Sequence, residues 1–142
     1  LPENLETIYD FNHREDVKMI KYVTAKIFMS GLHCWPKCNI DEVSFLKHSH
    51  RHLFVIKTIL MVFESDREVE FFMLQDEVRK IIKNKFSKTK LDMHDFGESS
   101  CEMIAEFICD KLVKKYGKNR DVFVEVEEDG ENGGIAIHDQ KL

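Results

Sequence analysis

The sequence predicts an α+β fold in which two helices lie between two pairs of strands. Residues 18–30 and 50–64 are rich in β-branched and aromatic residues and have no helical stripe. Residues 72–86 and about 99–116 carry apolar residues at helical spacing, and residues 121–137 return to an alternating pattern around a glycine-rich turn. The expected order is therefore strand, strand, helix, helix, strand, strand, in one domain.

The first two strands flank a long loop. Residues 31–49 contain glycine, proline and asparagine, which predicts a loop with room for one helical turn. The second strand, residues 50–64, is apolar on both of its faces. That pattern is typical of a strand that is covered on both sides.

The two helices and the last two strands have recognisable ends. The helix over 72–86 is followed by a polar loop, 87–97, and Ser99 or Ser100 is the expected N-cap of the next helix. That helix should run to about Tyr116 and end at Gly117. Residues 121–128 then alternate as a half-buried strand, the run DGENGG predicts a hairpin turn, and the last strand is expected over 135–137.

Composition limits the functions that need consideration. The chain has 142 residues, of which 43% are hydrophobic and 33% charged, and this indicates a globular domain over 18–142 behind a polar N-terminal arm, 1–17. A net charge of −5 disfavours an extended nucleic-acid partner. No segment has the apolar length of a membrane span, and the four cysteines form no dense disulfide pattern, so we expect a cytoplasmic protein.

Three histidines are the candidate metal ligands. His50 and His52 are two residues apart on a predicted strand, so both imidazoles point to the same face, and Arg51 points to the other. His33, at the end of the neighbouring strand, would complete a three-nitrogen site with one open position, as in catalytic zinc sites. Two alternatives stay open: a polar start of the strand that binds an anion, with Arg51 as a ligand-binding residue, and a closed zinc site that uses the cysteines at 34 and 38.

Four short motifs together resemble a known family. They are FMSGLH (28–33), HRHLF (50–54), LDM (91–93) and SSCEMIA (99–105). In order and spacing they are similar to the tunnelling-fold family of 6-pyruvoyl- and 6-carboxy-tetrahydropterin synthases, over about residues 18–138. The resemblance implies a four-stranded antiparallel sheet with two helices on one face, sheets that join into an oligomeric barrel, and pockets between subunits. Glu128 and the histidines would then serve one site from different chains.

The resemblance also implies ligand-binding residues. Glu128, with Glu127 beside it, stands where the family keeps a glutamate that grips the pterin ring, because a carboxylate can accept two parallel N–H bonds. Glu102 matches the glutamate of the family's helix motif, and Trp35 could stack on a flat ring. The alternatives are a solvated acidic turn for Glu127 and Glu128, a helix-dipole role for Glu102, and a core-covering role for Trp35.

Departures from the family decide between two functions. The family's catalytic cysteine is missing from residues 44–47, and its Asp-His pair is replaced by Ser87 and Lys88. We therefore expect non-catalytic binding, or sequestration, of a purine- or pterin-like nucleotide by a homo-oligomer. The HRH-x-F run and DREVEF (66–71) also resemble a small group of uncharacterised tailed-phage proteins, which would place the chain in a host cytoplasm. The alternative is a zinc-dependent pterin synthase-like lyase, whose catalytic residues the sequence does not identify.

Overall fold

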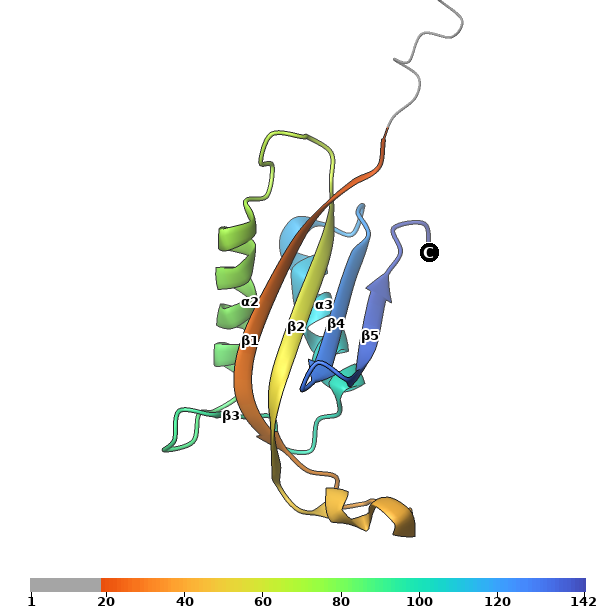
Figure 1. The fold of residues 1–142 in the computed structure, drawn as a ribbon. Helices are drawn as coiled ribbons and strands as arrows, with labels where there is room; N and C mark the ends of the chain where they lie inside the picture. Colours follow the sequence, from red (N-terminus) through yellow and green to blue (C-terminus); the bar gives the residue numbers. More distant parts are fainter. Residues whose placement is uncertain (1–18) are drawn as a thin grey trace, which may run out of the picture.

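The computed structural model describes residues 19–142, and the predicted arm over 1–17 lies outside the described residues. One mixed sheet forms the centre of the fold, in the order β3-β1-β2-β4-β5 (Figure 1). Its four longer strands are antiparallel neighbours at the places where the sequence predicts strands: β1 (Lys21–His33), β2 (His50–Val62), β4 (Val122–Glu128) and β5 (Asn132–His138). β1 runs into the loop expected over 31–49, and β5 begins inside the expected turn DGENGG.

A fifth strand corrects the expectation of four. β3 (His94–Asp95) pairs in parallel with the end of β1, through Gly31 and Leu32. It lies inside the loop expected over 87–97. A strand of two residues has no room for an alternating pattern, so periodicity could not reveal it.

Two helices cover one face of the sheet, as Figure 1 shows. α2 (Phe71–Lys85) begins at Glu70, whose side chain accepts a hydrogen bond from the backbone N–H of Met73. α3 (Cys101–Tyr116) is capped in the same way by Ser100 and ends at Gly117. A short 3₁₀ segment, η2 (Asp41–Lys47), supplies the helical turn expected in the loop between β1 and β2. Among residues 19–142, no helix is long and apolar enough to cross a membrane.

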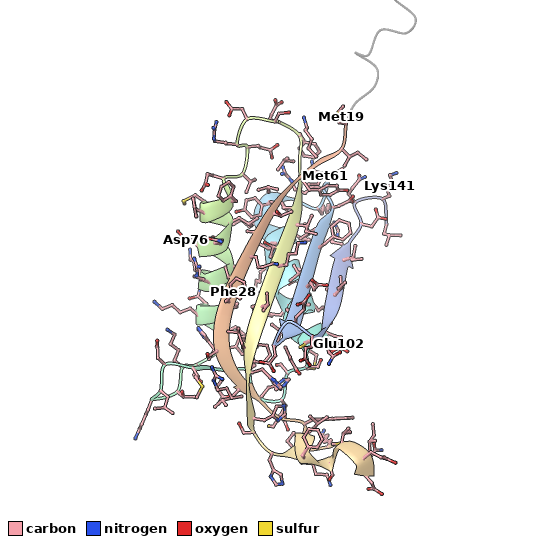
Figure 2. All side chains as sticks on the ribbon, viewed as in Figure 1. Met19, Phe28, Met61, Asp76, Glu102 and Lys141 are labelled. Atoms are coloured by element: carbon pink, nitrogen blue, oxygen red, sulfur yellow. The ribbon has the colours of Figure 1, made fainter. Side chains whose placement is uncertain are left out.

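The core lies between this sheet face and the helices. β2 contributes the fully buried Phe54, Ile56 and Leu60. No helix formed by residues 19–142 covers the opposite face of the sheet, and there Phe28, Ile135 and Ile137 are 63%, 57% and 58% exposed (Figure 2 places Phe28 on β1). Within the described chain, β2 is therefore covered on one side by helices, whereas the sequence predicts a cover on both.

Candidate metal centre and ligand pocket

Three histidines meet at one end of the sheet. The antiparallel register places His33, the last residue of β1, directly opposite His50, the first residue of β2. His52 follows two residues later on the same face. One ring nitrogen of each histidine lies within 4.8 Å of the other two. Strand alternation and the register of β1 against β2 therefore bring together the three ligands that the sequence predicts.

Each histidine ring is oriented through its Nδ1 atom. Nδ1 of His33 lies 3.0 Å from the carbonyl oxygen of Ser99, and Nδ1 of His50 lies 2.7 Å from that of His48. Nδ1 of His52 lies 2.7 Å from a carboxylate oxygen of Asp129. Because carbonyl and carboxylate oxygens only accept, each Nδ1 must donate its proton. In a neutral ring, Nε2 is then the free lone pair, which is the arrangement found in histidines that bind a metal.

Asp129 belongs to the site, although its place in the sequence indicates only a turn. Asp129 and Gly130 both have positive φ, 57° and 72°, as a type I′ hairpin turn requires. The turn directs the Asp129 carboxylate to His52 and to the backbone N–H of Leu53. The bond from Leu53 and that from His52 hold the pKa of Asp129 below its usual value, so the carboxylate stays ionised. The only sequence signal is an aspartate at the start of a hairpin.

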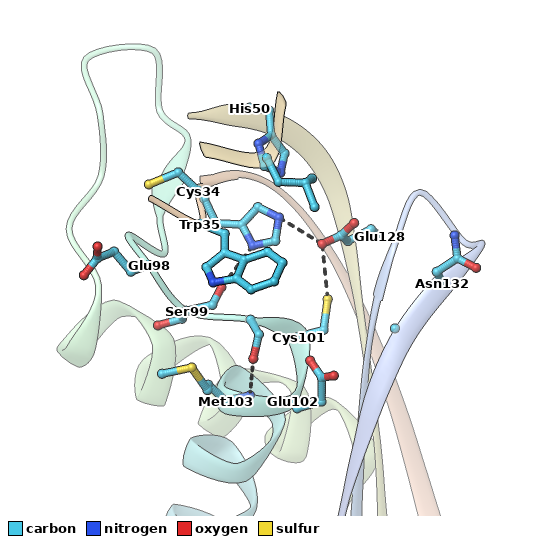
Figure 3. Close-up of a pocket in the computed structure, with 14 residues that line it drawn as sticks. Cys34, Trp35, His50, Glu98, Ser99, Cys101, Glu102, Met103, Glu128 and Asn132 are labelled. Carbon is cyan, nitrogen blue, oxygen red and sulfur yellow. Dashed lines mark hydrogen bonds and ion pairs between the residues drawn. The ribbon is translucent and has the colours of Figure 1, made fainter. Parts of the chain in front are cut away.

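The carboxylate of Glu128 lies against two of the histidines. Its Oε1 is 2.9 Å from Nε2 of His33, and its Oε2 is 3.3 Å from Nε2 of His52. Figure 3 shows Glu128 at the edge of the pocket, where the thiol of Cys101 approaches the same oxygen as His33, 3.5 Å from Oε1. The expectation that Glu128 and the histidines come from different chains is therefore wrong for this contact, because the strand ends of β1, β2 and β4 meet within one chain.

The donor set suits a transition metal. Nε2 of His50 and Nε2 of His52 are buried and make no hydrogen bond to any described residue, which is costly unless another group satisfies them. Three neutral imidazoles favour zinc or a similar ion over magnesium or calcium. In the described chain the cysteines do not join this cluster, and the thiol of Cys38 instead faces the carbonyl oxygens of Ile40 and Val43, each at 3.7 Å. The closed cysteine–histidine site thus finds no support.

A pocket of about 570 Å³ opens beside the histidines (Figure 3). Three of the predicted ligand-binding residues line it: Trp35, Glu102 and Glu128. Glu102 reaches it because the hairpin closes on the first turn of α3, where a Cβ on Gly134 would lie 2.6 Å from the Glu102 side chain. The remaining walls come from His33, Cys34, Leu46, His50, Glu98, Ser99, Ser100, Cys101, Met103, Asn132 and Gly133.

Two predicted ligand-binding residues lie elsewhere. Arg51 is on the face of the sheet that has no helix, where its guanidinium donates to the hydroxyl of Ser30 at 2.9 Å. Glu127 alternates with Glu128 along β4, and it shares a side-chain hydrogen bond with Glu125, whose pKa it raises. Neither residue lines the pocket.

Cys101 carries the largest pKa change that is resolved near the site. Burial raises the pKa of its thiol to about 12, with a further contribution from the negative charge of Glu128. The thiol therefore stays protonated near neutral pH and acts as a donor to the Glu128 carboxylate. The position of Cys101 in the sequence gives no sign that it belongs to the site.

No family model matches the chain, and no curated protein matches it in sequence. Solved structures do match. 6-Pyruvoyltetrahydropterin synthase from Plasmodium vivax is 14% identical, with a TM-score of 0.58, over 84% of this chain and 98% of that one. The enzyme of the same name from Plasmodium falciparum is 14% identical, with a TM-score of 0.55 and the same two coverages. An uncharacterised protein from Wolinella succinogenes is 14% identical, with a TM-score of 0.59, over 86% of this chain and all of that one.

These neighbours define the class of fold. The chain resembles the 6-pyruvoyltetrahydropterin synthases over nearly their whole length, so the predicted likeness to the tunnelling-fold family is confirmed at the level of structure. At 14–15% identity the likeness speaks for the fold alone. The function of this chain has to be argued from its own site.

Proposed function

We propose that this protein binds zinc through His33, His50 and His52 and holds a flat pterin- or purine-like ligand in the adjoining pocket without converting it. One observation carries the proposal: all three Nδ1 atoms donate to fixed acceptors, so three Nε2 atoms are aimed at one another beside an open pocket. Zinc bound there would supply a Lewis acid that binds or polarises an oxygen or nitrogen of the ligand.

The pocket walls suit a flat ring with an amidine-like edge. The carboxylates of Glu102 and Glu128 line one side, and each can accept two parallel N–H bonds from such an edge. The indole of Trp35, 42% exposed, offers a face for stacking. Guanine nucleotides and reduced pterins both have a flat ring whose edge carries two adjacent N–H donors.

Binding without conversion is supported by where the substituted residues lie. The stretch 44–47 stands where the synthases keep their cysteine, and the residue of it that lines the pocket, Leu46, has no group that can move a proton. Lys88, which stands in place of the family's histidine, pairs with Asp92 at 3.0 Å in the loop before β3. The thiol of Cys101, with its pKa near 12, is a poor proton acceptor near neutral pH.

A pterin synthase-like enzyme is the second candidate, and a specific observation favours it. A solved variant of the Plasmodium vivax enzyme has an alanine in place of a glutamate described as a catalytic residue. A carboxylate can therefore be a catalytic residue in an enzyme of this fold. In this chain Glu98 lines the pocket in addition to Glu102 and Glu128, and Cys34 lies next to His33. Glu98 or Cys34 could therefore move a proton for a bound ligand.

Assembly into a ring is part of the proposal. Within the sheet of the described residues, β5 forms one edge and β3 covers only two residues of β1 at the other, so both edges offer backbone groups that these residues leave unpaired. The sheet face without helices exposes Phe28, Ile135 and Ile137. Sheets joined edge to edge around this face would bury both features and give β2 the second cover that its sequence predicts.

Native mass spectrometry with calorimetry tests the proposal. The purified protein should be an oligomer with about one zinc per chain, and His50→Ala should lose the zinc. His138→Ala is the matched control, because its imidazole contacts Lys118 at the far end of β5. Zinc-loaded protein should bind a guanine nucleotide or dihydroneopterin triphosphate, and chromatography should recover the compound unchanged.

Four outcomes would contradict parts of this proposal separately. Recovery of a converted pterin favours the enzyme. Binding of neither compound removes the ligand assignment, even if zinc is present. Failure to take up zinc from a buffered solution removes the metal centre, and a stable monomer at micromolar concentration removes the ring.

A further inference from the structure

The position of the Glu128 carboxylate raises a problem of charge. Its two oxygens lie 2.9 Å and 3.3 Å from Nε2 of His33 and Nε2 of His52. Both rings already donate through Nδ1, so in their neutral form Nε2 has a lone pair and no proton. Two lone pairs facing a carboxylate at hydrogen-bond distance repel it. A positive charge has to lie between these groups.

The three rings lie close together: the ring centroid of His33 is 5.3 Å from that of His52 and 4.6 Å from that of His50. A single divalent cation satisfies the nitrogens and the carboxylate together. Two ligands of one tetrahedral zinc are about 3.3 Å apart, a spacing close to both observed distances.

We propose that Glu128 is the fourth metal ligand when the pocket is empty. The metal centre then has three nitrogens and one oxygen of this chain, with Glu128 approaching from the side of His33 and His52. The inference rests on the proposed zinc site and adds to it, because the same carboxylate also lines the ligand pocket. A ring that takes hold of Glu128 must take it from the metal, so ligand binding opens the fourth position.

The surroundings of the four groups support this assignment. Each has one outer partner that fixes its direction: Ser99 for His33, His48 for His50, Asp129 for His52, and the thiol of Cys101 for Glu128. Outer partners of this kind orient the ligands of metal sites. Glu102, the second carboxylate of the proposed ring site, makes no contact with the histidines among the ion pairs of the described residues.

Zinc affinity and cobalt spectroscopy test the inference. Loss of an outer partner alone costs about 10- to 100-fold in metal affinity, so Glu128→Gln should weaken zinc binding by on the order of 100-fold. Affinity is measured by competition with a chromophoric chelator. Glu102→Gln makes the same change of charge in the same pocket and should leave zinc affinity unchanged.

Cobalt(II) reports the donors directly. The visible spectrum of the cobalt-loaded protein should change in Glu128→Gln and in Glu128→Asp, whose shorter side chain keeps the charge and loses the reach. It should stay the same in Glu102→Gln. Azide should bind the cobalt of Glu128→Gln at much lower concentration than that of the unmodified protein, because the fourth position is then open. Circular dichroism of the metal-free variants checks that they are folded.

The inference is overturned if folded Glu128→Gln keeps both its zinc affinity and its cobalt spectrum while the unmodified protein binds zinc. A loss of affinity with an unchanged spectrum also overturns it, because Glu128 would then act through its charge alone. If the unmodified protein binds no zinc, the proposed function fails first, and the two failures are thus distinguishable.

Discussion

The two ends of the sheet each hold a polar cluster, and the two clusters are built differently. At the end where β1 begins, Arg120 is 9% exposed and its guanidinium bonds the Glu68 carboxylate at 2.6 Å and the carbonyl oxygen of Met61 at 3.0 Å. It also stacks over Phe63, 4.7 Å from the ring centroid. At the other end, three imidazoles face one another and a carboxylate.

The difference lies in complementarity rather than burial. The Arg120 cluster pairs a donor of fixed charge with acceptors, and the bond from Arg120 lowers the pKa of Glu68, so the carboxylate stays ionised. The histidine cluster brings together nitrogens of the same kind, two of which are buried without a hydrogen bond. Opposite charges neutralise each other at the first end, although Nε of Arg120 is buried there without a hydrogen bond among the described residues. Like groups that face each other, as at the histidine end, are suited to an added ion.

Among the substitutions that test the difference between the two ends of the sheet, Asp129→Asn should have the largest effect, which is a loss of zinc affinity. Asparagine tolerates the positive φ at this position and can still accept the N–H of Leu53. It removes the negative charge that orients His52, and such outer-shell changes cost roughly 10- to 100-fold in metal affinity. Chelator competition measures the loss, with Glu131→Gln in the same hairpin as the control. Equal zinc affinity in both variants would show that Asp129 only shapes the turn.

Glu68→Gln probes the opposite end. Glutamine can still accept from the N–H groups of Phe63 and Glu64, but the charged bond to Arg120 is lost. Removing one partner of a charge-assisted, part-buried bond typically costs about 1–3 kcal/mol. The free energy of unfolding in urea should fall by that amount while zinc affinity stays the same. A variant that lost zinc without losing stability would show that the two ends are not independent.

Much of this arrangement could be predicted from the sequence because it depends on local periodicity. The period of two along β2 places His50 and His52 on one face, and the apolar stripe and Gly117 define α3. The run DGENGG, which predicts the hairpin turn, is an equally local signal. The partners of the histidines depend instead on which loop lies against which strand end, and no local pattern encodes that. Asp129 and the carbonyl of Ser99 therefore became visible only in three dimensions.

Cys101 and Glu128 illustrate the same limit. Glu128 could be selected by its place at a strand end, but its contact with the histidines depends on the β2–β4 register, in which Glu128 pairs with Phe54. Cys101 belongs to the apolar stripe of α3, which predicts an inert core residue. Its role as a donor arises because the first turn of α3 meets the end of β4.

The smallest expected effect concerns the thiols. Burial and the charge of Glu128 raise the pKa of Cys101 from 9.0 to about 12 in the folded protein, so its thiolate is far rarer near pH 8 than that of an ordinary cysteine. Iodoacetamide at pH 8 should therefore modify the partly exposed Cys34 first and leave Cys101 unmodified until the chain unfolds. Peptide mass spectrometry over time measures both sites in one sample.

The raised pKa of Cys101 also makes the free energy of unfolding depend on pH. Because the folded pKa lies above the unfolded value of 9.0, the contribution of Cys101 is complete below pH 9 and is lost as pH rises toward 12. Cys101→Ser keeps a donor for Glu128 and titrates no thiol, so its stability should fall less steeply over that range. If alkylation of folded protein at pH 8 reached Cys101 as fast as Cys34, the thiol would not be held by the Glu128 carboxylate. The histidine end would then lack the outer partner that we assign to its fourth ligand.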